Sequence, residues 1–251
     1  MTESADTAEK NRQENSHFLK MFISAKRVEG CSENTLKYYQ TTIERLLSAT
    51  SKWIKEITTD DLRLYLAEYQ QQNNASKVTV DNVRRILSSF FSWLEDEDYI
   101  VKSPVRRIHK VKTAKVVKDT LTDENIEVLR DTCSNLRDLA IIEMLTSTGV
   151  RIGELVKLDK ADVDFAERSC IVLGKGNKER QLYLNEACLG ALEAHMAVRP
   201  DPKDDPRHKD ALFVSRNKTR LTTRAVENIV HKAVLQAGLD PKYSPHKLRH
   251  T

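Results

Sequence analysis

Twenty consecutive residues near the middle of the sequence carry seven basic side chains and no acidic one. They are residues 99–118, YIVKSPVRRIHKVKTAKVVK, and they include a proline. A stretch of this composition is typical of a linker and divides the chain into two parts. The full length of 251 residues is sufficient for two domains. We therefore expect a domain over residues 16–98, a basic linker over 99–118 and a second domain over 119–251, preceded by a flexible polar tail over residues 1–15.

The whole positive surplus of the chain lies in this linker. Residues 1–98 carry 13 basic and 16 acidic side chains, residues 119–251 carry 21 of each, and the net charge of the chain is +4. Seven positive charges without a counter-charge repel one another, so the composition favours a linker that crosses a polyanion. A linker that is simply solvated is the alternative.

Apolar residues in both parts recur mostly at helical spacing. Before the linker, this spacing predicts a bundle of amphipathic helices over residues 17–28, 32–47, 59–72 and 79–96. After the linker it predicts helices over residues 122–133, 136–148, 185–198 and 222–237. Two strand-like runs, SCIVL and RQLYL, flank a glycine-rich turn and predict a β-hairpin. The chain is expected to be mainly α, with a four-helix N-terminal domain and a mixed α+β second domain that contains a small antiparallel sheet.

Three short basic motifs stand out in the second domain. Arg151 directly follows Thr-Gly-Val at the end of the most apolar helix, and Lys175 lies between two glycines at the tip of the hairpin. His246 and Arg249 are three residues apart, which places them on one face of a helix. Taken singly, each motif has an ordinary interpretation: a helix-start arginine, a solvated turn or a surface cluster.

Taken together, TGVRIGEL, GKGNKER and PHKLRHT follow a four-helix domain in an order that resembles the tyrosine recombinase family, the phage integrases and Xer-type site-specific recombinases. The resemblance covers residues 16–251. It implies a SAM-like core-binding domain, then a catalytic domain in which Arg151, Lys175, His246 and Arg249 are catalytic and Glu154 is structural. It also implies cleavage and rejoining of double-stranded DNA at a specific recombination site through a 3′-phosphotyrosyl intermediate, in a tetramer on paired sites.

The chemistry of these residue types agrees with that implication. Displacement at a phosphodiester builds negative charge on the non-bridging oxygens, which Arg151 and Arg249 can clamp with forked hydrogen bonds. Lys175 is the candidate general acid for the departing 5′ oxygen, and His246 hydrogen-bonds a phosphate oxygen or assists proton transfer from the nucleophile. Neither role needs a metal or another cofactor, and the sequence offers no carboxylate cluster for a metal.

The nucleophile of the family is a tyrosine beyond the His-x-x-Arg motif, and none of the seven tyrosines of this sequence occupies that position. Tyr243 lies near His246 but on its N-terminal side, so we expect it to be a packing residue. We therefore expect that the sequence is a piece of a longer enzyme, and that these 251 residues bind DNA without forming the covalent link.

Further DNA contacts are expected from both domains and the linker, although a solvated charge is the alternative at each position. The candidates are Thr35, Lys37, Tyr38, Asn82, Arg84 and Arg85 in the first domain, Arg106 and Arg107 in the linker, and Lys178, Arg180, Arg224, His231 and Lys232 in the second domain.

Two other functions stay open: a catalytically silent DNA-binding regulator on the same scaffold, and a strand-relaxing enzyme similar to type IB topoisomerases. Because the sequence has no signal peptide and no apolar membrane span, we expect a cytoplasmic protein.

Overall fold

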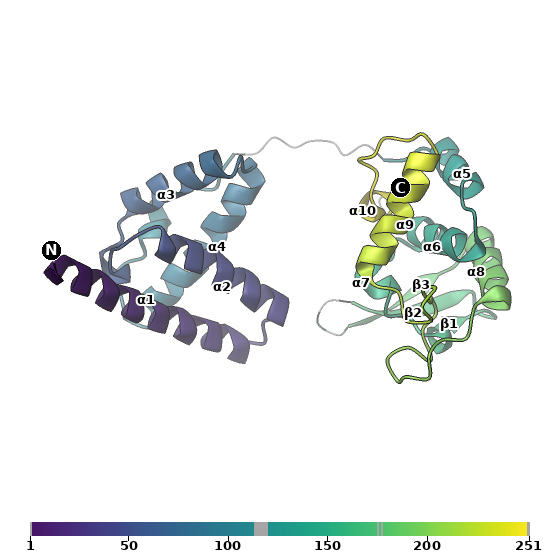
Figure 1. The fold of residues 1–251 in the computed structure, drawn as a ribbon, viewed down its shortest axis with the longest axis horizontal. Helices are drawn as coiled ribbons and strands as arrows, with labels where there is room; N and C mark the ends of the chain where they lie inside the picture. Colours follow the sequence, from purple (N-terminus) through teal and green to yellow (C-terminus); the bar gives the residue numbers. More distant parts are fainter. Residues whose placement is uncertain (1, 113–119, 175, 177, 250–251) are drawn as a thin grey trace. The chain divides into compact units, whose positions relative to one another are not determined.

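The computed structural model describes residues 2–112, 120–174, 176 and 178–249, and for residues 2–6 it describes the backbone alone. The chain forms two compact units, Met1–Val116 and Val117–Thr251 (Figure 1). Within the described residues, no helix is both long and apolar enough to cross a membrane. Residues 113–119, the end of the basic segment, and Lys175 at the hairpin tip lie outside the described residues.

The first unit is a helical bundle, as the sequence predicts. Its helices are α1 (Thr2–Val28), α2 (Glu33–Ser48), α3 (Thr59–Gln72) and α4 (Lys77–Asp96), with short 3₁₀ turns η1 (Ile54–Glu56) and η2 (Pro104–Arg107). The core is lined by aromatic and aliphatic side chains from every helix, and Phe22, Phe90 and Phe91 are fully buried in it. Two helix N-termini are capped by the serine that precedes them. Ser32 and Ser76 each accept a hydrogen bond from a backbone N–H of the helix that follows.

The N-terminal residues differ from the flexible tail expected over residues 1–15. From Thr2 onward they form the first half of α1, which reaches well beyond the bundle-forming apolar residues. Asn15, 3% exposed, accepts a hydrogen bond from Ile54 N (2.8 Å) and donates one to Lys52 O (3.0 Å). Polar contacts of this kind anchor the middle of the helix. A prediction from apolar spacing alone does not detect them, so the helix predicted over residues 17–28 is shorter than α1.

The first part of the basic segment packs against the first unit. Val105 in η2 is buried, and Thr59 Oγ1 donates a hydrogen bond to the Pro104 carbonyl (2.7 Å). The carboxylate of Glu95 on α4 pairs with Arg106 at 2.9 Å. A counter-charge for this arginine therefore lies on α4, outside the twenty residues whose charges the sequence argument counted.

A second carboxylate of α4 holds the segment further along. Asp81 accepts hydrogen bonds from the Arg84 guanidinium (2.8 Å) and from Val111 N (3.1 Å). The side chains of Asp81 and Arg84 are only 11% and 14% exposed. Arg84, predicted to contact DNA, is thus occupied in an ion pair that docks the segment, and its largely buried partner balances its charge.

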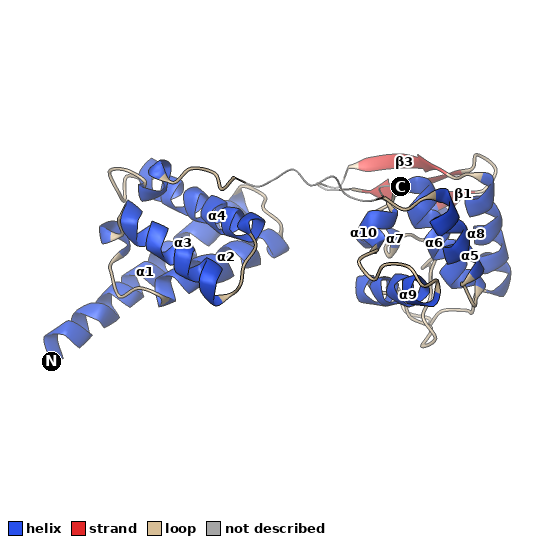
Figure 2. Ribbon diagram, turned by 90° about the horizontal axis from the view of Figure 1, so that it is seen from above, coloured by secondary structure: helices blue, strands red, loops and turns tan. Residues whose placement is uncertain are grey.

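The second unit places a small sheet beside a group of helices (Figure 2). The helices are α5 (Asp123–Asp131), α6 (Leu136–Thr148), α7 (Ile152–Leu155), α8 (Glu186–Val198), α9 (Thr223–Gln236) and α10 (Pro245–Leu248), with a 3₁₀ turn η3 (Lys160–Asp162). The strands β1 (Val163–Asp164), β2 (Ser169–Leu173) and β3 (Glu179–Tyr183) form an antiparallel sheet in the order β1-β2-β3. The predicted hairpin is confirmed, whereas β1 has too few residues to leave a pattern in the sequence.

Helix α6 is the centre of this unit. Its middle residues are fully buried, among them Ile141, Ile142 and Leu145, and both α5 and α8 pack against it. The side chains of Asn135 and Asn185 cap the N-termini of α6 and α8 by accepting hydrogen bonds from backbone N–H groups. Since a helix buried on most sides cannot shift, the residues that follow its C-terminus are held in fixed positions.

The cap of α3 gives a pH-dependent prediction. Asp61 accepts hydrogen bonds from Lys52 (2.7 Å) and from Thr58 N (2.8 Å), and these bonds lower its pKa to about 2. A lowered folded-state pKa stabilises the fold fully above the ordinary value of 3.8, and the benefit is lost as the pH falls towards about 2. We expect Asp61→Asn to lower the free energy of unfolding at neutral pH and to have little effect near pH 2.

The matched control is Asp60→Asn, which removes the same charge from the same helical turn but not the cap, because Asp60 pairs only with Arg63 among the described residues. Urea unfolding measured across this pH range distinguishes the two variants. Equal losses for both would mean that only the charge at the helix N-terminus matters.

Candidate active site

The turn between α6 and α7 positions the first arginine of the site. Helix α6 ends at Gly149, whose backbone is left-handed (φ +61°), and Arg151 then precedes α7 as its N-cap residue. A Cβ atom on Gly149 would lie 3.5 Å from both Cγ and the carbonyl oxygen of Arg249. Glycine permits the left-handed turn, and Arg249 packs against Gly149 at ordinary van der Waals distance, beside Arg151.

A single buried carboxylate connects the basic side chains. Glu154 of α7 is 7% exposed and accepts hydrogen bonds from Arg151 N (3.0 Å), Arg151 Nη1 (2.8 Å) and Arg180 Nη2 (2.5 Å). Desolvation raises the pKa of Glu154, but the hydrogen bonds from Arg151 and Arg180 outweigh it and hold the pKa below its ordinary value. Glu154 is thus ionised at neutral pH and fixes two guanidiniums at once.

The third guanidinium belongs to Arg249, which directly follows α10. Desolvation lowers its pKa, and the neighbouring charges of Arg151 and Arg180 lower it further. Its side chain forms no ion pair or hydrogen bond with a described residue. Three guanidiniums around one carboxylate leave an excess of positive charge, and such an excess in a partly desolvated site favours an anion.

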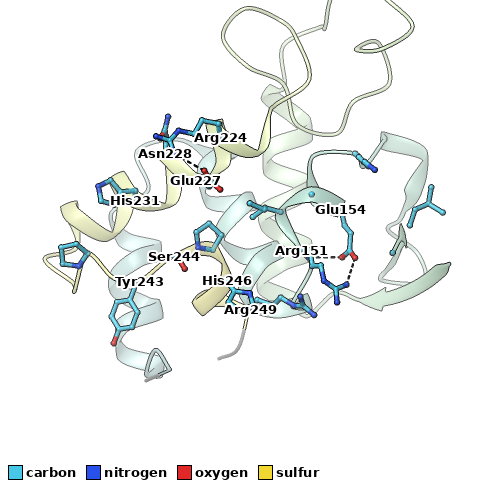
Figure 3. A pocket seen from close by; sticks show the side chains of 17 residues that line it. Arg151, Glu154, Arg224, Glu227, Asn228, His231, Tyr243, Ser244, His246 and Arg249 are labelled. Atoms are coloured by element: carbon cyan, nitrogen blue, oxygen red, sulfur yellow. Dashed lines mark hydrogen bonds and ion pairs between the residues drawn. The ribbon is translucent and has the colours of Figure 1, made fainter. Parts of the chain in front are cut away.

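Arg151, Glu154 and Arg249 line a pocket of about 940 Å³ in the second unit (Figure 3). Glu154 enters it from α7 and Arg151 from the N-cap of that helix, and His246 and Arg249 enter from α10 and the residue after it. The facing wall belongs to α9, which contributes Arg224, Glu227, Asn228 and His231. Arg224 pairs with Glu227 at 3.4 Å, so the charge of Arg224 is balanced within that wall.

The structure therefore brings together five of the residues predicted from the sequence, although they come from segments up to almost a hundred residues apart. They are Arg151, Arg224, His231, His246 and Arg249. Arg180 joins them through its hydrogen bond to Glu154, rather than pointing outward from the hairpin. Lys175 lies outside the described residues. Lys178 is exposed at the turn end of the hairpin, directly before β3, and Lys232 lines a different pocket, with Arg137 and Arg216.

The candidates in the first unit lie mainly on its surface. Lys37, Tyr38 and Arg85 are exposed, Asn82 is half-buried, and Thr35 takes part in the cap of α2, where its hydroxyl lies 2.9 Å from that of Ser32. Arg106 and Arg107 are exposed on the docked part of the basic segment. These residues are accessible to a ligand, with the exception of the ion-paired Arg84.

Sequence reasoning missed the link between Glu154 and Arg180. A signal was present, because side chains alternate along a strand and Arg180 is two residues before Leu182, which is buried. Arg180 therefore faces the inner side of the sheet, as Leu182 does. Among the described residues no group of three or more His, Cys, Asp or Glu side chains could hold a metal ion.

A helical unit followed by a mixed unit with an arginine-lined pocket is the architecture of the integrase fold. Residues 119–251 match the model of the phage integrase family, and residues 18–100 match that of the phage integrase N-terminal SAM-like domain. The chain belongs to the phage integrase family, that is, to the tyrosine recombinases.

Individual relatives cover most of the chain. The tyrosine recombinase XerC of Oceanobacillus iheyensis is 32% identical over 246 residues, which cover 93% of this chain and 80% of that protein. A lambda integrase dimer bound to a COC' core site aligns with a TM-score of 0.75 at 18% identity and covers 94% of this chain and 86% of that one. A lambda integrase tetramer bound to a Holliday junction has the same TM-score at 17% identity, over 94% of this chain and 70% of that one. Both structures show the same fold.

The glycine before Arg151 gives a prediction for the site. We expect Gly149→Ala to lower the free energy of unfolding by about 1–2 kcal/mol, because alanine is strained in the left-handed region. Gly153→Ala is the matched control, since its backbone is not left-handed and its Cβ atom would meet nothing within 4 Å. Chemical denaturation measures both changes. A Gly149→Ala protein as stable as the Gly153→Ala protein would show that the turn does not require glycine.

Proposed function

We propose that this protein is a site-specific DNA recombinase that cleaves and rejoins double-stranded DNA through a 3′-phosphotyrosyl intermediate. The observation that carries the proposal is the placement of Arg151 and Arg249, from different segments, side by side in one pocket with surplus positive charge. Membership of the tyrosine recombinase family supports the same conclusion. The substrate is double-stranded DNA, as in the lambda integrase complex with its core site.

The two arginines act as a clamp on the phosphodiester. Arg151 uses Nη1 for Glu154, and its Nε and Nη2 donate no hydrogen bond to a described residue. The Arg249 side chain likewise makes none within the described chain. Both guanidiniums therefore offer N–H groups to the non-bridging oxygens, where negative charge grows as the phosphorus becomes five-coordinate. Because Glu154 holds Arg151 before DNA binds, little reorganisation of this guanidinium is needed in the transition state.

Two further residues supply proton transfer. His246 lines the pocket from α10 and is suited to hydrogen-bond a phosphate oxygen or to accept the proton of the nucleophile. Lys175 is the candidate acid for the departing 5′ oxygen, because a primary ammonium on a hairpin can approach a leaving group from the solvent side. On this scheme the bond energy is kept in the protein–DNA ester, so no nucleotide cofactor is consumed.

The nucleophile is not one of the seven tyrosines of this sequence. Only Tyr243 lines the pocket among the described residues, and its ring is directed away from Arg151 and Arg249 (Figure 3). The Lys247 ammonium lies 4.9 Å from the centre of that ring, in a cation–π contact that suits a packing residue. Of the others, Tyr183 is on the sheet and the remaining five are in the first unit.

We therefore expect these 251 residues to bind nicked duplex DNA without forming a covalent product. Denaturing gel electrophoresis after incubation detects a protein–DNA ester directly. Tyr243→Phe is the control and is expected to bind the same DNA equally well. A covalent product that disappears in Tyr243→Phe would contradict the proposal and identify Tyr243 as the nucleophile.

The basic segment gives a prediction for DNA binding. If Arg106 and Arg107 contact phosphates, their joint replacement by alanine weakens binding to all sequences alike and lowers the slope of log affinity against log salt by about 2. The matched control is the joint replacement of Arg12 and Arg27, two exposed arginines of α1, by alanine. Titration of a labelled duplex at several salt concentrations measures the slopes. Unchanged affinity and slope in the Arg106 and Arg107 variant would remove the segment from the DNA interface.

The proposed recombinase differs from the two alternative functions, a strand-relaxing enzyme and a silent regulator, in its assembly and in what it does to plasmid DNA. We propose a tetramer on paired sites, by analogy with the lambda integrase tetramer on a Holliday junction. A strand-relaxing enzyme would instead remove supercoils from a plasmid with a single site, and a silent regulator would do neither. Because the 251 residues alone are expected to do neither, recombination and relaxation assays with the same plasmid pair distinguish the three in a protein that also carries a nucleophilic tyrosine after the His-x-x-Arg motif.

A further inference from the structure

We propose that Arg180 is a positioning residue: it occupies one oxygen of Glu154 so that Arg151 keeps a complete edge of its guanidinium for the phosphate. The inference rests on the proposed function, because it concerns how the same pocket prepares to bind a phosphodiester. It changes the role of Arg180 from the direct DNA contact predicted from the sequence to one that acts through Glu154 and Arg151.

Arg180 occupies a place in the fold where a charged side chain is costly. It lies in β3 opposite Val172, two residues before the buried Leu182, and its side chain is 35% exposed. Its Nε is buried and has no hydrogen-bond partner within the described part of the chain. A partly buried guanidinium with one unsatisfied N–H needs a compensating interaction, and the 2.5 Å bond from Nη2 to Glu154 supplies it.

The two oxygens of Glu154 are divided unequally. Oε2 accepts from Arg151 N (3.0 Å) and from Arg180 Nη2 (2.5 Å), whereas Oε1 accepts only from Arg151 Nη1 (2.8 Å) among the described residues. A carboxylate and a guanidinium otherwise prefer two parallel hydrogen bonds. Since Arg180 fills Oε2, Arg151 is confined to a single bond with Oε1, and its Nε and Nη2 stay available.

Removal of Arg180 would open that oxygen. Arg151 could then pair with both oxygens of Glu154, and the second bond would use an N–H that the phosphate requires. The site would keep its fold and its Arg151 but would bind an anion less well, because the internal ion pair competes with the ligand.

Arg180 also ties the hairpin to the same carboxylate. A Cβ atom on Gly174 would lie 3.3 Å from the Lys178 carbonyl and 3.8 Å from Glu154 Oε1, and Gly174 N donates to that carbonyl at 2.8 Å. Gly174, at the turn end of the hairpin, therefore lies close to the carboxylate of Glu154. One buried charge sets the position of both the arginine after α6 and the strand pair.

The competing explanation is that Arg180 attracts the phosphate through its own charge. Its proximity to Arg249, whose pKa it helps to lower, makes this a real alternative. The two explanations differ in one respect: an effect that passes through Arg151 disappears when residue 151 cannot form a forked pair, whereas a direct charge effect does not.

A double-mutant cycle with inorganic phosphate as the probe separates them. Phosphate binding to the 251-residue chain is followed at constant ionic strength through the NMR signals of the arginine Nε–H groups. We expect Arg180→Met to weaken binding about fivefold in the wild-type background, and less than about twofold when Arg151→Lys is already present. Before phosphate is added, the Arg151 Nε–H or Nη2–H protons should exchange with water more slowly in Arg180→Met than in the wild type.

Arg224→Met is the charge-matched control, because Arg224 lies on the facing wall and touches neither Glu154 nor Arg151 in any described contact. It should give equal fold-losses in both backgrounds. If Arg180→Met does not fold, as judged by thermal unfolding, Arg180→Gln replaces it in the same cycle. Equal losses from the Arg180 change in both backgrounds, or no loss in either, would overturn the inference.

The proposed function fails in a different way. A wild-type chain that shows no saturable phosphate binding, or one that binds equally well after Arg151→Lys and Arg249→Lys, would contradict the clamp itself. Saturable binding that depends on Arg151 and Arg249 but is additive with Arg180 would overturn only the positioning role.

Discussion

The buried ion pair of Glu154 is the constraint on which the site depends. An ionised carboxylate at 7% exposure is unfavourable unless its oxygens are filled, and Arg151 and Arg180 fill them from α7 and from the sheet. The same interaction fixes the turn after α6 and the inner edge of β3. Arg249, which follows α10, packs against Gly149 and adds a positive charge that has no partner in the described chain.

The first unit and the basic segment follow a similar principle. Charges that the sequence presents as a continuous positive run are partly neutralised by carboxylates of α4, where Glu95 pairs with Arg106 and Asp81 with Arg84. The segment up to Val111 is therefore a part of the first unit rather than a free connection. The side chain of Arg106 is exposed, so a DNA phosphate would compete with Glu95 for it. The ion pair between Arg84 and Asp81 is largely buried, so DNA would not reach it.

Local rules predicted most of the fold, because its helices are marked by apolar spacing and side-chain caps such as Thr122 and Asn185, and the hairpin by glycines between two apolar runs. They did not anticipate tertiary polar contacts: Asn15 anchors the middle of α1, and Asp81 forms an ion pair with Arg84. Motif order predicted the family, and the motif residues Arg151, His246 and Arg249 line one pocket in the structure. It did not reveal the inward direction of Arg180, which the alternation of side chains along β3 indicates, nor its bond to Glu154, which depends on the packing of α7 against the sheet.

The most direct test is a structure of this chain bound to duplex DNA. The account predicts that one phosphodiester lies within hydrogen-bond distance of both Arg151 and Arg249, while Arg180 keeps its bond to Glu154. A complex in which the DNA contacts the second unit elsewhere, with both guanidiniums far from every phosphate, would contradict it.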